Sequence, residues 1–339
     1  MKDSQKAKKL LTLTLASLLI LTGCQKQHVP NLKTIALTQI IEHKAIDAER
    51  EGFIAGLKEA GFEDGKNISI HFENAQGSIA TAAQIATKFI SLKPAMIVAL
   101  TTPSAQSVVL AASKTDIPVI FSTVTDPVGA KIVTQNEAPR TDNVTGISDY
   151  LSASAQLDCI QKLLPHAKKI GVIYNPGEAN SLLIMKDLKA EALKRGLQIV
   201  EATASKTSDV VTAAQSLIGK VDAIHIPNDN TAVASIGSII AVGEKNKIPV
   251  FAADTGSFDA GVVAIAGYDR FLLGKRLAEY AIKILKGEKA SALPVLRDHP
   301  VQFYVNIDAA KKMGMPLDPV LDKKKLQGFV IRSGQHNQS

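Results

Sequence analysis

Short apolar segments of strand length alternate with longer amphipathic segments along most of the chain. The segments that we predict as strands are 33–39, 67–73, 95–100, 118–121, 169–174, 197–201, 223–226, 249–252 and 262–266. The segments that we predict as helices are 44–60, 78–92, one beginning at Thr102 or Ser104, 152–164, 178–195, 207–219, 230–245 and 269–286. Strands that read as apolar runs are buried on both faces, and intervening helices favour parallel pairing. The pattern therefore predicts an α/β protein with doubly wound parallel sheets.

This alternation runs twice, which predicts two lobes. Helix 269–286 and segment 301–306 remain after the second set, and we expect them to cross back between the lobes. The crossings are then near 146–148, 267–269 and 300–302. The predicted parts are an N-terminal lobe of 33–147 plus 268–300, a C-terminal lobe of 148–267 plus 301–330, and a tail at 331–339. Two doubly wound lobes joined by three hinge crossovers resemble type I periplasmic binding proteins.

The first 23 residues have the pattern of a bacterial signal peptide. Four lysines and one aspartate precede an apolar run over 10–21, which is too short to span a membrane comfortably. The run ends in Leu21-Thr22-Gly23-Cys24, which resembles the lipobox of bacterial lipoproteins. The resemblance implies a diacylglycerol on the Cys24 sulfur, cleavage before Cys24 and a lipid-anchored tether over 24–32. An ordinary secretory signal with a chance cysteine is the alternative.

Removal of the leader changes what the composition implies. The formal net charge is +7 for the whole chain and falls to +4 without residues 1–23. No Lys/Arg-rich block with interleaved aromatic residues is present, so we expect no nucleic-acid partner. Cys159 is the only cysteine after Cys24, so stability must come from a buried core rather than from disulfides within the chain. We expect a monomer without a cofactor or a metal ion.

Polar residues follow most of the predicted strands, at the edge where ligands of open α/β sheets bind. The candidate ligand-binding residues are Gln39, Thr101, Thr102, Ser104, Thr125, Asp126, Tyr174, Asn175, Glu178, Asn180, Ser181, Asn228, Asp229, Asn230 and Asp254. Short donors at helix N-termini, such as Thr102 and Ser104, favour an anion such as a carboxylate. Asp126, Asp229 and Asp254 suit an ammonium group. Together these residues predict a site for a zwitterion.

Each of these residues also has a purely structural interpretation. Ser, Asn and Asp at strand-to-helix turns serve as helix N-caps whether or not a ligand binds nearby. The positions therefore predict that some of the residues contact a ligand without identifying which.

Several of the same segments resemble the ABC-transporter substrate-binding lipoproteins of the tryptophan/tyrosine type. The matching segments are 101–105, 124–130, 143–146, 174–181, 227–231 and 267–269, and the resemblance extends over essentially the whole chain after the leader. It implies that the lobes close on an amino acid, often aromatic, and that the closed form docks on a membrane permease driven by a cytoplasmic ATPase. The protein would then be anchored to the cell membrane and would face the periplasm or the cell exterior.

The chain has no Trp, so a sandwich of aromatic rings around a ligand would draw on other residues. The candidates are Phe53, Phe121, Tyr150, Tyr174, Phe251 and Tyr268, each of which also suits core or hinge packing. Lack of Trp also weakens the prediction of a sugar ligand.

Other functions have less support. The sequence has no Gly-x-Ser-x-Gly elbow, Walker loop, His-Glu-x-x-His motif or Gly-x-Gly-x-x-Gly after its first strand, so we expect no enzyme. An extracytoplasmic receptor that presents its ligand to a sensor, or a binder of a sugar or nucleoside, remains the alternative.

Overall fold

The computed structural model describes residues 32–134, 143–318 and 321–332. The predicted signal peptide, Cys24, the tether up to residue 31 and positions 333–339 of the predicted tail lie outside the described residues. Lys33 onward forms one compact unit. Within the described ranges, no helix combines the length and apolar character needed to cross a membrane.

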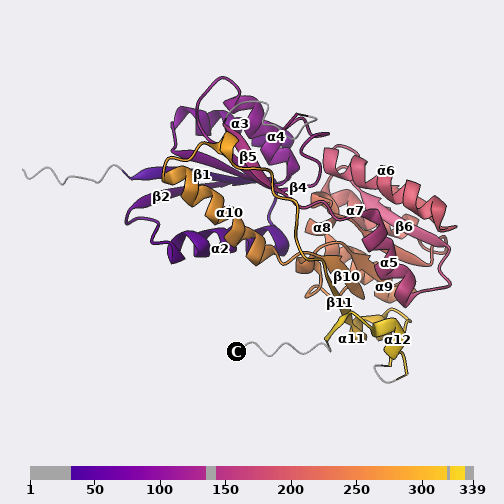
Figure 1. The fold of residues 1–339 in the computed structure, drawn as a ribbon. Coiled ribbons are helices and arrows are strands. Elements are labelled where there is room, and N and C mark those ends of the chain that lie inside the picture. The colour runs from indigo at the N-terminus through magenta and orange to yellow at the C-terminus, as the bar shows by residue number, and fades with distance from the viewer. Residues whose placement is uncertain (1–31, 135–142, 319–320, 333–339) are drawn as a thin grey trace, which may run out of the picture. The chain divides into compact units, whose positions relative to one another are not determined.

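The N-terminal lobe is built on a five-stranded parallel sheet (Figure 1). Its strands are β1 (Lys33–Gln39), β2 (Ile68–Asn74), β3 (Met96–Leu100), β4 (Val119–Val124) and β5 (Val144–Ser148), in the order β2-β1-β3-β4-β5. Its helices are α2 (Lys44–Glu59), α3 (Ile79–Ser91), α4 (Thr102–Ala112) and α10 (Arg270–Leu285). Ile35 and Leu37 of β1 share a core cluster with residues of α2 and α10, whereas Ala36 belongs to the cluster of α3 and α4. Alternate residues of the strand thus face different helix layers, as expected for a doubly wound sheet.

The C-terminal lobe contains a seven-stranded sheet in the order β12-β11-β10-β9-β8-β6-β7. Its strands are β6 (Lys169–Tyr174), β7 (Gln198–Thr203), β8 (Ala223–Ile226), β9 (Val250–Ala252), β10 (Ala264–Gly267), β11 (Gln302–Asn306) and β12 (Val330–Arg332). Its helices are α5 (Ala153–Leu163), α6 (Ala179–Lys194), α7 (Val210–Ser216), α8 (Asn230–Ala234), α9 (Ile236–Asn246), α11 (Ile307–Lys312) and α12 (Lys323–Leu326). All strand pairs are parallel except β10 with β11. The predicted fold class, α/β with two parallel-dominated sheets, is confirmed.

Two features of the C-terminal lobe differ from the sequence prediction. The single helix predicted over 230–245 is divided into α8 and α9, because Ser235 between them has a non-helical backbone (φ −115°, ψ 21°). Strand β12 pairs in parallel with β11 and includes Ile331 and Arg332, which the sequence pattern assigns to the tail. The strand has only three residues, too few for its periodicity to be read from the sequence.

The segments that connect the two sheets are hydrogen-bonded to one another. The Tyr268 hydroxyl donates to the Tyr150 carbonyl oxygen at 2.7 Å, and His299 Nε2 donates to the Ser148 carbonyl oxygen at 2.9 Å. Ser148 and Leu296 also pair through the backbone, with Ser148 N 2.8 Å from Leu296 O. The backbone around 148–150 is therefore held by both of the other connections.

Helices α2 and α10 touch through their backbones, because small residues occupy the crossing. A Cβ atom added at Gly274 would lie 1.9 Å from the carbonyl oxygen of Glu49, and one added at Gly52 would lie 2.0 Å from that of Phe271. This close approach brings Glu49 and Arg270, one on each helix, into contact.

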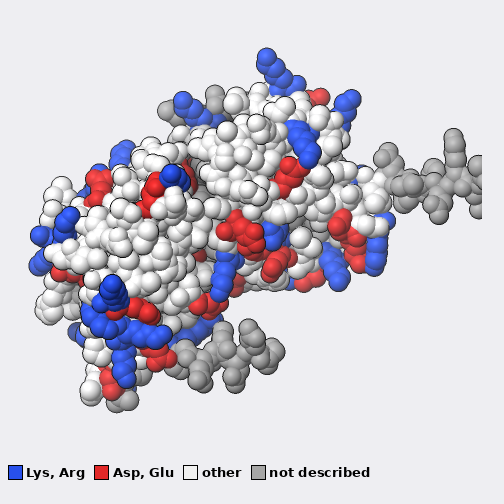
Figure 2. Space-filling view, turned by 180° about the vertical axis from the view of Figure 1, so that it is seen from behind, with Lys and Arg blue, Asp and Glu red and all other residues white. Residues whose placement is uncertain are grey.

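The charged surface residues are mixed in sign. On the face shown in Figure 2, Lys and Arg side chains are interspersed with Asp and Glu. The Lys323–Lys325 cluster belongs to α12, where Lys325 pairs with Asp322 at 3.1 Å.

Candidate functional site

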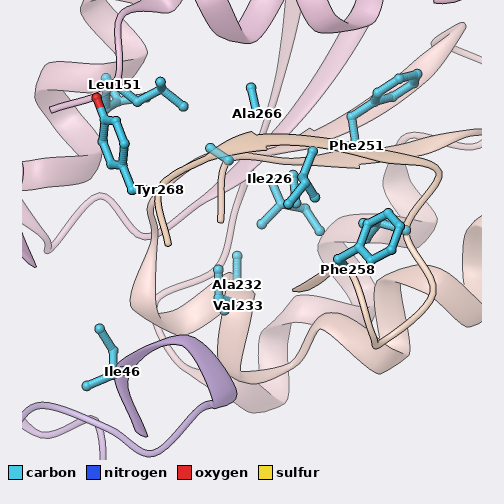
Figure 3. Close-up of a cluster of buried hydrophobic side chains, with 14 of the residues drawn as sticks. Ile46, Leu151, Ile226, Ala232, Val233, Phe251, Phe258, Ala266 and Tyr268 are labelled. Carbon is cyan, nitrogen blue, oxygen red and sulfur yellow. The ribbon is translucent and has the colours of Figure 1, made fainter. Parts of the chain in front are cut away.

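A polar cavity of about 20 Å³ is lined by residues of both lobes and of their connections. Its lining consists of His43, Ala45, Ile46, Thr123, Thr125, Asp149, Asn180, Asn228, Asp229, Asn230, Val233, Asp254 and Arg270. Figure 3 shows two of its apolar residues, Ile46 on α2 and Val233 on α8, beside the apolar core of the C-terminal lobe. The cavity has room for about one water molecule.

A second cavity of about 270 Å³ lies against the first and shares Asn230 with it. Its N-terminal-lobe side is mostly apolar and its C-terminal-lobe side is polar. The lining consists of Ile40, Ile41, Gly77, Ile79, Pro103, Asn175, Gly177, Glu178, Ser205, Asn230 and Thr231. Its volume approaches the lower end of the range for small-molecule sites.

The candidate residues from the sequence divide into two groups. Those that line one of the cavities are Thr125, Asn175, Glu178, Asn180, Asn228, Asp229, Asn230 and Asp254. Those that line neither are Gln39, Thr101, Thr102, Ser104, Asp126, Tyr174 and Ser181.

Four residues of the second group have local partners that account for them. Gln39 Nε2 donates to Asp47, the Tyr174 hydroxyl donates to Glu201, and the Ser181 hydroxyl donates to Asp229. Asp126 accepts from the backbone N–H of Val128 at 3.1 Å. For these four residues, local hydrogen bonds within the fold explain why a polar side chain is present, and no ligand is needed to explain it.

The start of α4 is different, because its hydroxyl groups are buried without partners. The side-chain oxygens of Thr101, Thr102 and Ser104 have no hydrogen-bond partner among the described residues, although each residue is at most 1% exposed. Thr101 also has a strained backbone (φ 82°, ψ 153°), in a region that is nearly restricted to glycine. Buried hydroxyls are normally paired. This helix N-terminus therefore has donors available for an anion.

A second strained residue lies at the end of the neighbouring strand. Thr123 has φ 54°, and its hydroxyl donates to Glu49 and accepts from Arg270 at 3.0 Å. Strain of this kind at adjacent strand ends is typical of functional sites.

Two buried carboxyl groups without a basic partner among the described residues stand at the C-terminal-lobe side. Glu178 accepts from Asn230, Thr231 and Asn180. Asp229 accepts from the Asn175 and Ala232 backbone N–H groups and from the Ser181 hydroxyl. Burial and the nearby charge of Glu178 raise the pKa of Asp229 to about 7.

Sequence reasoning missed Arg270, whose guanidinium lies between two buried carboxylates. It is 2.9 Å from Asp149 and 3.6 Å from Glu49. Burial opposes the charge of Arg270, but these carboxylates and Asp254 keep its pKa above the ordinary value. Burial also raises the pKa of Glu49. The signal in the sequence that could have identified Arg270 is the preceding residue, Asp269. Asp269 caps α10 by accepting from Leu272 N, so Arg270 is the first residue of that helix.

His43 and Asp254 complete the cavity from opposite lobes. Burial lowers the pKa of His43 despite the nearby charge of Asp254. Asp254 accepts from the backbone N–H and hydroxyl of Ser257, which caps the short 3₁₀ turn Thr255–Ser257.

Comparison with known proteins gives a consistent result. The model of the family described as "ABC transporter substrate binding protein" matches residues 34–325. A protein of Clostridioides difficile named "tyrosine-binding protein" is 39% identical over 325 residues, which cover 91% of this chain and 93% of that protein.

Solved structures of similar proteins agree. A Vibrio cholerae conserved domain protein has a TM-score of 0.83 at 38% identity and covers 89% of this chain and all of its own. A Streptococcus pneumoniae domain in complex with L-Trp has a TM-score of 0.81 at 28% identity, and the match covers 89% of this chain and 100% of that domain. A ligand-free, open substrate binding protein from Clostridium difficile has a TM-score of 0.65 at 38% identity, and the match covers 90% of this chain and 100% of that protein. A glucose-galactose binding protein from Geobacillus stearothermophilus and an ABC sugar transporter subunit from Rhodobacter sphaeroides, both below 20% identity, share only the fold. The chain belongs to the ABC transporter substrate-binding protein family.

Proposed function

We propose that this protein captures an L-amino acid, of the aromatic class, between its two lobes and delivers it to an ABC permease. The observation that carries this proposal is the set of unpartnered buried polar atoms at and beside the cavities. On α4 they belong to Thr101, Thr102 and Ser104, next to Pro103, which lines the second cavity. Around the polar cavity they are Asn180 Oδ1, Asn228 Oδ1, His43 Nδ1 and Arg270 Nε. A ligand that contributes both donors and acceptors satisfies them, as a zwitterion does.

The carboxylate of the ligand is best accommodated at the N-terminus of α4. Three hydroxyl donors there are buried and unpartnered, and the helix dipole favours negative charge. The strained backbone of Thr101 supports this assignment, since such strain persists where function requires it.

The ammonium group is best accommodated in the polar cavity. Among the described residues, its lining includes Asp149 and Asp254 against the single guanidinium of Arg270, and Asp229 adds negative charge as the pH rises through about 7. A buried excess of negative charge favours a cation.

The ligand side chain is then left with the second cavity. Ile40, Ile41, Ile79 and Pro103 give its apolar wall. None of the six aromatic residues named as candidates for a ring sandwich is among the lining residues of either cavity. We therefore expect aliphatic side chains, rather than stacked rings, to contact the ligand.

Relatives support closure of the lobes on the ligand. This chain matches the L-Trp complex better than the ligand-free, open protein (TM-scores 0.81 and 0.65), although the open protein is closer in sequence. The lobes here thus resemble the ligand-bound relative more closely. Because the polar cavity has a volume of only about 20 Å³, ligand entry requires the lobes to separate.

Lipid attachment at Cys24 completes the proposal. A lipidated residue followed by a short tether keeps the binding protein near the permease and raises its effective concentration there. Replacement of Cys24 by Ser should release the protein from the membrane fraction, whereas membrane retention of that variant would exclude the anchor.

The ligand is tested by thermal-shift screening of the mature chain, residues 24–339, with amino acids, sugars, nucleosides and peptides. We expect L-tyrosine or L-tryptophan to raise the unfolding temperature, because a ligand that binds only the folded state stabilises it. A response limited to sugars or nucleosides would exclude the zwitterion.

A further inference from the structure

Two asparagine side chains of the C-terminal lobe present unpartnered carbonyl oxygens at the polar cavity. Asn180 and Asn228 both line the cavity, and the Oδ1 atom of each is buried without a hydrogen-bond partner among the described residues. Asn180 is only 3% exposed. An asparagine amide has a donor end and an acceptor end, so what faces the ligand depends on how the amide is turned.

The orientation of Asn228 is determined by Asp149. Asn228 Nδ2 donates at 3.1 Å to Oδ2 of Asp149, which lies on the connection between β5 and α5. A carboxylate only accepts hydrogen bonds, so it holds the donor end of Asn228 and leaves the acceptor end free.

Asp149 is itself fixed in place. The residue is fully buried, and its carboxylate accepts from Thr125 Oγ1 at 3.2 Å and pairs with Arg270 Nη2 at 2.9 Å. Its neighbours Ser148 and Tyr150 accept hydrogen bonds from the other two connections between the sheets. The carboxylate that orients Asn228 is therefore anchored where the connections meet.

Glu178 orients Asn180 in the same way. Asn180 Nδ2 donates to Glu178 Oε2 at 3.1 Å and also to the backbone carbonyl oxygen of Asn228 at 2.9 Å. Glu178 is held by Asn230 and Thr231 at the start of α8. Each amide nitrogen thus donates to a carboxylate, and both Oδ1 atoms are without a partner among the described residues.

We propose that Asp149 and Glu178 are positioning residues that turn Asn228 and Asn180 into acceptors for a ligand ammonium group. The inference rests on the proposed function and deepens it, because it identifies what distinguishes an amine from a neutral group. An ammonium has three N–H donors, and two of them pair with the free Oδ1 atoms while the cavity carboxylates supply the countercharge. A ligand that has no donor at this position leaves both oxygens unpaired and binds more weakly.

The test is a set of variants of the mature chain titrated with two probes, L-tyrosine and 3-(4-hydroxyphenyl)propanoate, which lacks the amine. Asp149 Oδ2 accepts from both Asn228 Nδ2 and Arg270 Nη2, so an amide oxygen at the same place would leave Asn228 as it is. In Asp149→Ala this acceptor is removed, and Asn228 is free to turn its N–H toward the ligand. We expect L-tyrosine affinity to fall about 10- to 100-fold, with little change for the probe without an amine.

The double variant, Asp149→Ala with Asn228→Asp, restores the acceptor. The carboxylate introduced at position 228 has no donor end, so it presents an oxygen to the cavity whichever way it is turned. We expect most of the lost preference for L-tyrosine to return, which a purely structural role of Asp149 does not predict. Asn228→Ala removes the acceptor and leaves the ion pairs of Arg270 in place. It should also lower the preference for L-tyrosine over the probe without an amine.

Glu178→Ala gives the second arm, because it removes the oxygen that accepts from Asn180 Nδ2, and we expect a lowered preference for L-tyrosine. Asp158→Asn is the matched control, because it removes a carboxylate charge at an exposed position paired with Arg195 on the surface, and its affinities should be unchanged. Thermal unfolding of each variant identifies those that do not fold.

The outcomes separate the inference from the proposed function. Binding by the unaltered protein with an undiminished preference in Asp149→Ala and Asn228→Ala would overturn the inference alone. The same would follow if the double variant discriminated no better than Asp149→Ala. Failure of the unaltered protein to bind L-tyrosine, L-tryptophan or any other amino acid would overturn both.

Discussion

Replacement of Gly274 by Ala should destabilise the protein strongly, because α2 and α10 touch at this position. The added Cβ would lie 1.9 Å from Glu49 O and 2.6 Å from Phe53 N, both backbone atoms that cannot move away by a side-chain rotation. Cβ contacts below 3.0 Å are essentially never seen, so one helix must shift by at least about 1 Å.

The expected magnitude follows from this contact and from the helical propensity of alanine. Overpacking of this kind costs about 1–3 kcal/mol, and a contact with rigid backbone places Gly274→Ala at the upper end. Alanine returns about 0.5–1 kcal/mol through backbone entropy. We therefore expect a net loss of about 2 kcal/mol, which for a protein of this size is a decrease of roughly 3 °C in the unfolding midpoint.

Gly237→Ala is the matched control. Gly237 is also helical, in α9, but a Cβ atom there meets nothing within 4 Å. The same substitution should stabilise the protein by about 0.5–1 kcal/mol. The assay is thermal unfolding followed by far-ultraviolet circular dichroism. Equal midpoints for Gly274→Ala and the unaltered protein would refute the backbone contact between the helices, and with it the packing that places Glu49 beside Arg270.

Three further changes follow from the site. Thr101→Gly should raise the unfolding free energy by about 1–3 kcal/mol, because glycine tolerates this backbone conformation. The same substitution should weaken amino-acid binding, because the hydroxyl is lost. Calorimetry that shows an unchanged unfolding free energy and an unchanged affinity would exclude the strain argument. Arg270→Met should cost about 3–5 kcal/mol, since Glu49 and Asp149 lose their buried countercharge, and urea unfolding that gives a loss below about 1 kcal/mol would contradict the ion pairs. Asp229 has a pKa raised to about 7 in the folded state, so the folded protein holds the proton more tightly than the unfolded one. The contribution of Asp229 to the free energy of unfolding therefore falls as the pH rises from about 4 to 7, and Asp229→Asn should remove that decrease. If the unfolding free energies of the unaltered protein and of Asp229→Asn change in parallel over this pH range, the pKa of Asp229 is ordinary.

Much of the fold could be predicted because its strands are short apolar runs with clear limits. β1, β6 and β8 have the residues that the hydrophobic pattern indicates, and most helices begin within a residue or two of the predicted start. The pattern failed where local geometry overrides periodicity, as at Ser235, and where a strand such as β12 depends on its neighbour rather than on its own sequence.

The site was less predictable, since strand ends identify an edge and not a cavity. Asp126 and Tyr174 lie at that edge but pair locally, as their residue types also allow. Asp149 and Arg270 line the cavity although neither belongs to a strand-to-helix turn of its own lobe. They reach the site only because the chain crosses between the sheets at these points, which no local pattern records.

Isothermal titration of the mature chain with L-tyrosine and L-tryptophan tests the central claim most directly. The proposed zwitterion site predicts saturable binding of at least one of them with a Kd in the micromolar range or tighter, weakened in Asn228→Ala. Absence of binding to any amino acid, together with binding of a sugar or nucleoside, would contradict the account.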